Sequence, residues 1–349
     1  TEHEITGPAI ALPLYQGVMF NQLSLNTKSH VSGTGFQAAW EKTELARRTA
    51  VTPQYLMGQV AYGTLNGECR IAYRRIARTT DSRTWIGCLL PKLPCGDSVF
   101  LLIPRVSSDA VHLESFCSTL WYDWSVRQRL GGTNLSWFVV SETAALRGDE
   151  RIRDVIELAG LACHGPVLQL APQWLRMQEY VKSHKQSAAS TLAERIRNEV
   201  ILHSLTAARL ALSWDNMRHV LKDCDYSINH INSQSTEFDS RGFWRVDKDK
   251  PPEQRLTVLS LVAFHDLQAK IDECDGDVEK GIEAFCTQND GEGWMLPDSL
   301  RLADYGLGHD DRALEPQPVR ECFGPRFHDW QLAQSPEESW RECHLHARN

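Results

Sequence analysis

The sequence lacks the features that place a chain in a membrane or in an oxidising compartment. No apolar run approaches the roughly 18 residues that a membrane-spanning helix needs. The first residues, Thr1-Glu2-His3-Glu4, are too polar and acidic for a signal peptide. The ten cysteines are scattered without a Cys-x-x-Cys pair, which is typical of reduced thiols. We therefore expect a cytoplasmic protein with no membrane partner.

The sequence also lacks the motifs of several enzyme classes. It has no Gly-x-x-x-x-Gly-Lys phosphate loop, and no lysine has Asp or Glu two positions earlier, the spacing of common metal-dependent nucleases. Amino-methyltransferases hold the target amine with an Asn/Asp/Ser-Pro-Pro-aromatic loop. The Pro-Pro pair here, Pro251-Pro252, lies between Lys250 and Glu253 and does not match that loop. We expect no catalytic residue and no metal site in this chain.

Charge is divided unevenly along the chain. The formal net charge is −8, which argues against a uniformly basic nucleic-acid coat. Residues 1–186 hold 19 Lys+Arg and 16 Asp+Glu, whereas residues 187–349 hold 18 and 29. Arginine outnumbers lysine by 27 to 10, and its planar guanidinium suits phosphate and guanine edges better than an ammonium does. Any anionic partner is therefore expected on the first half.

The pattern of apolar residues predicts an α+β fold. Short apolar or extended runs at residues 60–62, 70–76, 85–90, 98–103 and 135–140 indicate strands. Helical spacing over residues 112–129 ends at Gly131-Gly132. We expect a mixed, bent sheet with flanking helices in residues 1–186, followed by a mainly helical part in residues 187–349.

Helix signals dominate the second part. Thr191 and Glu194 have the spacing of a capping box, and apolar residues then mark one helix face. Two short helices are expected at residues 207–212 and 215–221. Residues 226–250 are polar and loop-like, and Pro251-Pro252 marks the start of a further helix.

The most distinctive segment is rich in arginine. Residues 70–83 contain five arginines and a single acidic residue, Asp81. Strand alternation would place Arg70 and Arg74 on one face and Arg75 on the other. Further along, the Gly131-Gly132 turn is followed by Thr133 and Asn134, small polar residues that suit contact with a phosphate or a base edge.

In order along the chain, these segments resemble the target-recognition region of large bacterial N6-adenine DNA methyltransferases. These are the fused type IIG restriction–modification enzymes and the related methyltransferases of the BREX and DISARM phage-defence systems. In that family Arg-x-Ala-(Phe/Tyr)-Arg-x-(Ile/Val)-Ala-Arg-x-Thr-Asp-x-Arg-Thr precedes an apolar strand ending Leu-Leu-Pro, and a helix and Gly-Gly-Thr-x-Leu-x-x-Phe follow. The matching positions here are Arg70, Ala72, Tyr73, Arg74, Arg78, Thr80, Asp81, Arg83, Thr84, Leu90, Pro91, residues 131–135 and Phe138.

The resemblance implies sequence-specific binding of double-stranded DNA. The family's catalytic core, which binds S-adenosylmethionine, has no counterpart here, so the chain looks like the recognition half of a longer enzyme. It would then need a methyltransferase catalytic domain in cis or in trans, and other defence-system proteins are possible partners. The expected DNA-contacting residues are Arg70, Arg74, Arg75, Arg78, Arg83, Thr133 and Asn134, with Lys28 and His30 as phosphate candidates. Arg83 could instead form a buried pair with Asp81.

Two other classes of function stay open at this point. The acidic second half, with its aromatic tail, also fits a helical protein-interaction module without DNA affinity. An independent enzyme with an unrecognised site, for instance around Asp247, Asp249 and His265, is the third alternative. The first predicts a protein partner and no DNA binding, and the second predicts catalysis by the isolated chain.

Overall fold

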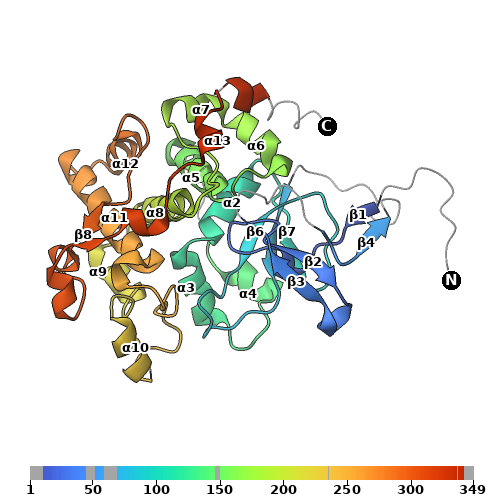
Figure 1. The fold of residues 1–349 in the computed structure, drawn as a ribbon, viewed down its shortest axis with the longest axis horizontal. Coiled ribbons are helices and arrows are strands. Elements are labelled where there is room, and N and C mark those ends of the chain that lie inside the picture. The colour runs from blue at the N-terminus through green and yellow to red at the C-terminus, as the bar shows by residue number, and fades with distance from the viewer. Residues whose placement is uncertain are drawn as a thin grey trace.

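The computed structural model describes residues 11–44, 52–58, 69–145, 150–234, 236–335 and 337–341. Within these ranges small antiparallel sheets occupy the N-terminal part and helices dominate the rest (Figure 1). The predicted α+β class is confirmed. The strand expected at residues 60–62 lies outside the described residues.

A three-stranded antiparallel sheet forms the centre of the N-terminal part. The central strand is β5 (Cys69–Arg74), which pairs with β6 (Gly87–Pro91) on one side and β7 (Val99–Leu102) on the other. Separate hydrophobic clusters cover its two faces, with Ala72 in one and Ile71 in the other. Because both faces are covered, most side chains of β5 are buried, including an arginine.

The remaining described strands form two-stranded sheets. β1 (Ala11–Pro13) pairs with β4 (Leu56–Gly58), β2 (Lys28–Ser32) with β3 (Ala39–Lys42), and β8 (Ser299–Leu300) with β9 (Gln317–Pro318). All three pairs are antiparallel, and a parallel bridge joins Tyr15 to Cys95. The β2–β3 hairpin extends from the body of the protein at the lower right of Figure 1.

The single helix expected over residues 112–129 is two helices. α2 (Asp109–Cys117) ends before Ser118, and α3 (Leu120–Arg129) begins after Thr119. The Thr119 hydroxyl accepts a hydrogen bond from the Tyr122 amide, so it caps α3 at its start. Ser and Thr compete with the helical hydrogen bonds in this way, which explains the break. α3 ends just before Gly131-Gly132, as predicted.

The strand expected over residues 135–140 is instead a short helix, α4 (Trp137–Glu142). Ser136 has the extended backbone of an N-cap residue, and the chain turns into the helix from there. A short apolar run does not distinguish a strand from a helix, and this one was assigned wrongly. The consequence is that Leu135 is buried whereas Trp137 and Phe138 lie on the surface.

Helices make up most of the chain beyond residue 150. The α-helices are α5 (Glu150–Cys163), α6 (Ala171–Arg176), α7 (Gln178–Ser183), α8 (Leu192–Arg209), α9 (Trp214–Val220), α10 (Ile228–Gln234), α11 (Leu256–Glu273), α12 (Val278–Thr287) and α13 (Asp329–Leu332). Thr191 caps α8 by accepting from the Glu194 amide, as its spacing predicted. The helix expected at residues 207–212 is the end of α8, and α10 lies in the stretch expected to be a loop.

Helix α8 packs against both α5 and α11, and these three helices carry the main core (Figure 1). Its buried residues include Leu120 and Ile156 from the first part and Val200 and Phe264 from the second. One hydrophobic cluster therefore draws residues from both sides of the predicted boundary at 186–187, which lies between α7 and α8. The two-domain division stays a prediction.

Candidate nucleic-acid interface

The segment after β5 lies beside the segment after the Gly131-Gly132 turn. The Ala77 amide donates to the Thr133 carbonyl at 3.0 Å, and the Leu135 amide donates to the Arg75 carbonyl at 2.8 Å. An antiparallel bridge joins Ile76 to Asn134 between these two hydrogen bonds. The structure thus brings the end of the arginine segment together with Thr133 and Asn134, two of the residues expected to contact DNA.

We call residues 75–78 and 133–138 the recognition edge. Its exposed apolar side chains are Ile76, Trp137 and Phe138, which are 59%, 69% and 56% exposed. The Trp137 and Phe138 rings meet edge to face with centroids 6.3 Å apart. Thr133 and Asn134 are exposed as well. Aromatic rings beside arginine and small polar groups are the side chains that stack on bases and bind phosphate.

Arg75 and Arg78 supply the positive charge of the recognition edge. The Arg75 guanidinium lies over the Phe100 ring and 3.7 Å from a carboxylate oxygen of Asp97, which is almost fully exposed. Exposed ion pairs at this distance stabilise little, so phosphate can replace Asp97. The Arg78 side chain is exposed. Its carbonyl accepts a 2.9 Å hydrogen bond from the Thr84 hydroxyl, which fixes the backbone of the loop.

Arg127 fixes the loop at residues 79–82 through hydrogen bonds to its backbone. It is fully buried on α3, where its Nε donates to Asp123 at 3.0 Å. Its guanidinium carbon Cζ lies over the Phe243 ring, 4.1 Å from the ring centroid. Its two terminal nitrogens donate to carbonyls of both the loop and a distant segment. These carbonyls belong to Thr79, Asp81, Ser82, Arg241 and Gly242. The orientation of the recognition edge therefore depends on a residue that does not belong to it.

Arg70 and Arg83 do not lie on the surface, contrary to the expectation that they contact DNA. Arg70 is 2% exposed and donates to the Pro91 and Leu93 carbonyls at the edge of the sheet. Arg83 pairs at 3.1 Å with Glu199 on α8, a residue 116 positions away. It is a buried pair, but the suggested partner Asp81 is wrong, because Asp81 is exposed. Both guanidinium groups are therefore engaged in hydrogen bonds within the protein.

Arg74 is also directed inward, although it is only partly buried. Its guanidinium donates to the Phe20 carbonyl and lies over the Phe20 ring. Burial lowers the pKa of this guanidinium. Among the arginines of residues 70–78, the surface positions are therefore Arg75 and Arg78.

Lys28 and His30 lie together on the β2–β3 hairpin, away from the recognition edge in sequence. Lys28 is exposed and lies opposite Lys42 in the strand register. His30 is half-buried, with its Nε2 2.8 Å from the Gly33 carbonyl and its ring against Trp40. These two residues thus belong to a second surface.

Sequence reasoning missed three residues that shape the recognition edge. Trp137 and Phe138 lay in the run assigned to a strand, and their exposure follows only once that run is a helix. Arg127 precedes the Gly131-Gly132 turn by four residues, and no role was assigned to it from the sequence. The available sequence signal was its i,i+4 spacing from Asp123, which allows the two side chains to pair on one face of the helix.

The residues of the alternative enzyme site do not converge. Asp247 accepts from the Leu256 amide at the start of α11 and pairs with Lys250. His265 lies nine residues further along α11, about 14 Å along the helix axis. Asp249 pairs with Lys248 on the surface. Each has a local structural role. In the part of the chain that the structure describes, no cluster of His, Cys, Asp and Glu side chains could hold a metal ion.

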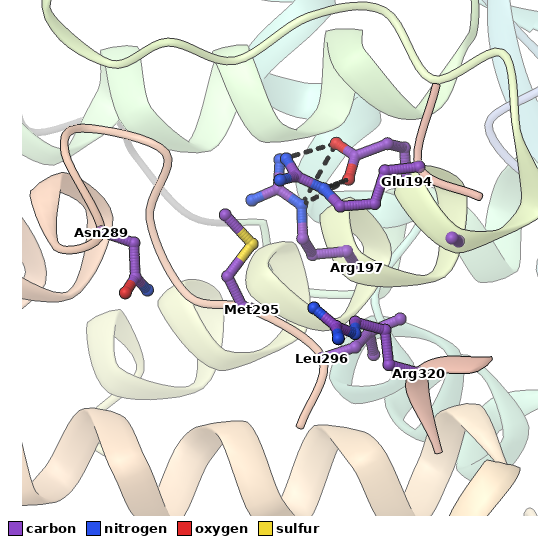
Figure 2. A pocket seen from close by; sticks show the side chains of 8 residues that line it. Glu194, Arg197, Asn289, Met295, Leu296 and Arg320 are labelled. Atoms are coloured by element: carbon purple, nitrogen blue, oxygen red, sulfur yellow. Dashed lines mark hydrogen bonds and ion pairs between the residues drawn. The ribbon is translucent and has the colours of Figure 1, made fainter. Parts of the chain in front are cut away.

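A cavity of about 150 Å³ lies where α8 meets the segment leading into β8. Figure 2 shows that its charged groups bind one another: both carboxylate oxygens of Glu194 contact guanidinium groups, among them that of Arg197. Arg326 completes the cluster. Burial alone would raise the pKa of Glu194, but Arg197 and Arg326 hold it below its usual value. The charged side chains at this cavity form a structural ion cluster. None of the expected DNA-contacting residues lines the cavity.

Comparisons with known proteins give little to place beside this geometry. No family model and no solved structure matches the chain. Among curated proteins, the Sec-independent protein translocase protein TatA of Bartonella quintana (strain Toulouse) is 35% identical to this chain over 68 residues. The matched stretch covers 20% of this chain and 66% of that protein. The chain therefore spans slightly less than two thirds of that relative. No helix within the described ranges is long and apolar enough to cross a membrane.

Proposed function

We propose that this chain is the DNA-recognition part of a cytoplasmic, site-specific DNA-modification enzyme. It would act with an adenine-methyltransferase domain, in cis or in trans, that binds S-adenosylmethionine and receives the flipped base. Other defence-system proteins are further proposed partners. The observation that carries the proposal is the recognition edge, where the half-buried Arg75 and the exposed Arg78 lie beside Thr133, Asn134 and two exposed aromatic rings.

The chemistry of the recognition edge supports both kinds of DNA contact. Arg75 and Arg78 can each form an ion pair with a phosphate or donate two parallel hydrogen bonds to the edge of a guanine. The Asn134 amide has the donor and acceptor that pair with adenine, and the Thr133 hydroxyl serves either a base or a phosphate. Because the hydrogen bonds between residues 75–77 and 133–135 are made by the backbone, these side chains remain available to a ligand.

Replacing the two surface arginines should reduce DNA affinity and its dependence on salt. We expect Arg75→Gln combined with Arg78→Gln to weaken binding of a random-sequence duplex about 10-fold to 100-fold at low salt. The slope of log affinity against log salt should fall by up to about 0.9 for each lost phosphate contact. Fluorescence anisotropy over a salt titration measures both quantities.

The matched control keeps the same change in net charge away from the recognition edge. Arg105 and Arg301 are exposed, the first beyond β7 at the opposite end of the sheet and the second before η6 (Leu302–Tyr305). Arg105→Gln with Arg301→Gln should leave the slope nearly unchanged. Equal losses in the two double variants would mean that net charge alone drives binding. No binding by the unaltered chain at low salt would instead favour the protein-interaction module.

A further inference from the structure

The β2–β3 hairpin carries a fully exposed aromatic ring at its tip. We call residues 28–42 the hairpin arm. Phe36 lies in the short 3-10 turn η2 (Gly35–Gln37) between the strands and has no shielding from the rest of the described chain. Val31, just before the turn, is 57% exposed. A large apolar side chain so placed has no folding role, since it buries no surface in this structure.

Glycines shape the tip so that the ring stands clear. Gly33 and Gly35 both have positive φ, a conformation that disfavours other residues. A Cβ at Gly33 would lie 2.3 Å from the Gln37 carbonyl oxygen, so only glycine fits there. A Cβ at Gly35 would meet nothing within 4 Å, which shows that the space around the tip is open. The turn is therefore tight, and it presents Phe36 outward.

One face of the hairpin arm combines positive charge with aromatic rings. The register places Lys28 opposite Lys42 and His30 opposite Trp40, and strand alternation puts all four on the same face. Like charges directly opposite each other destabilise a strand pair. Both lysines are exposed, and neither takes part in an ion pair within the described residues. An anion between the two lysines would turn this repulsion into attraction.

The hairpin arm is long enough to reach the floor of the major groove of DNA. Four residue steps separate Lys28 from Ser32, which is about 13 Å at the rise of a strand, and the turn that carries Phe36 lies beyond. The major groove of B-DNA is about 12 Å wide and about 8.5 Å deep, and it admits a two-stranded ribbon. When the tip reaches the base pairs at the floor of the groove, the two lysines lie outside the groove, from where their long side chains extend toward the phosphate backbone.

The hairpin arm is also connected to the recognition edge through the body of the protein. Its strand β2 packs against the short turn η1 (Gly17–Met19). The Gly17 amide donates to the Ser98 hydroxyl, and the Ser98 carbonyl accepts from the Arg75 amide. A short chain of contacts therefore joins the hairpin arm to the recognition edge.

We propose that the hairpin arm enters the major groove of duplex DNA and inserts Phe36 as an apolar wedge against a base step, with Lys28 and Lys42 on the flanking phosphates. This inference rests on the proposed function and adds to it a second contact that distorts the DNA. Apolar side chains wedged between base steps partly unstack those bases, as minor-groove binders show. A modification enzyme needs such unstacking, because it must remove one base from the stack.

Removing the ring tests the wedge directly. We expect Phe36→Ala to bind duplex DNA about tenfold more weakly with an unchanged salt slope, because a stacking contact is lost and no charge is removed. The probe is a random-sequence duplex pool with 2-aminopurine at one fixed position, whose fluorescence rises when its neighbours unstack. The rise should be lost in the variant. Val31→Ala, an exposed apolar change on the opposite face of the same hairpin arm, is the control and should preserve the rise.

Three outcomes separate this inference from the proposed function. Binding by the unaltered chain with a fluorescence rise that Phe36→Ala abolishes supports both. Salt-dependent binding that is identical in Phe36→Ala, with the same fluorescence, overturns the wedge and leaves DNA recognition standing. No duplex binding by the unaltered chain overturns both. Circular dichroism melts of each variant verify that the fold is intact, as the exposure of both side chains leads us to expect.

Discussion

Replacing Arg127 by Met should destabilise the protein by about 3–5 kcal/mol, the range found when one partner of a buried ion pair is removed. The guanidinium is fully buried, pairs with Asp123 and donates to five backbone carbonyls. Met preserves the aliphatic stem, so the loss reports the charge and its hydrogen bonds. In the variant Asp123 would retain the Thr84 amide and a longer contact to Arg83.

Urea denaturation measures this effect as a difference in the free energy of unfolding. Arg129→Met is the control, because Arg129 is exposed in the last turn of the same helix and donates only to the Ser125 carbonyl among the hydrogen bonds described. We expect that control to change stability by less than about 0.5 kcal/mol. Similar costs for the two variants would mean that the buried cluster contributes no more than a surface charge.

The same substitution also affects the loop next to the recognition edge. Arg127 joins the loop at Thr79–Ser82 to the segment at Arg241 and Gly242, so it fixes Arg78 relative to the helical part of the chain. Arg83 makes a second such connection through Glu199 on α8. Contacts from the neighbouring loop to residues far along the chain therefore position the recognition edge. The side chains of the recognition edge itself take no part in these contacts.

The local parts of this fold could be predicted from the sequence. The strands around β5 are bounded by turn residues, and α8 begins at the N-cap residue Thr191, so nearby residues determine both. The break between α2 and α3 and the helix α4 were missed for a different reason. A Ser-Thr pair and a six-residue apolar run are compatible with more than one structure, and tertiary packing decides between them.

The arginines show where sequence reasoning reaches its limit. An arginine that binds phosphate and one that holds two loops together look alike in a motif. Arg70, Arg83 and Arg127 are buried because carbonyls or carboxylates meet them from segments up to 116 positions away. Neither the backbone pairing of residues 75–77 with residues 133–135 nor the exposure of Trp137 and Phe138 was predicted from the sequence.

A second buried cluster, at the junction of the sheet with α2 and α5, makes stability depend on pH. Glu114 is fully buried, and one of its carboxyl oxygens accepts from the Ser118 hydroxyl at 2.7 Å. The other lies 3.6 Å from Nε2 of His164. That nitrogen accepts from the Leu89 amide at 3.1 Å, and Nδ1–H donates to the Gly160 carbonyl at 2.9 Å, so the imidazole is neutral.

Burial controls the protonation of both groups. It lowers the pKa of His164 to about 3, and it raises the pKa of Glu114 to about 8 despite the opposing effects of Ser118 and Arg195. Glu199 raises the pKa of Glu114 further. In the folded protein at neutral pH, Glu114 is therefore protonated, whereas in the unfolded chain it ionises near pH 4.5.

The sign of the pH dependence follows from this difference. Between about pH 4.5 and about pH 8 the folded state holds one more proton at Glu114 than the unfolded state does. The contribution of Glu114 to stability is fully present below about pH 4.5 and is lost as the pH rises through about 8. The loss amounts to about 1.4 kcal/mol per pH unit inside this window, on the order of 5 kcal/mol in all.

Glu114→Gln should remove this loss. Gln is uncharged at every pH and can still accept from the Ser118 hydroxyl. We expect the free energy of unfolding of the variant, relative to the unaltered chain, to rise by about 4 kcal/mol between about pH 5 and about pH 8.5. The neutral histidines His112 and His164 titrate alike in both proteins, so their acid-side effect cancels in the difference.

Urea denaturation at a series of pH values measures this difference, and Glu142→Gln, at an exposed position on α4, is the matched control. The control should show a flat difference across the same range, because its carboxylate is in water in both states. If Glu114→Gln were equally flat, Glu114 would be ionised in the fold. A buried carboxylate without a cation in hydrogen-bond contact would then have to be stabilised by Ser118 and the more distant Arg195 alone.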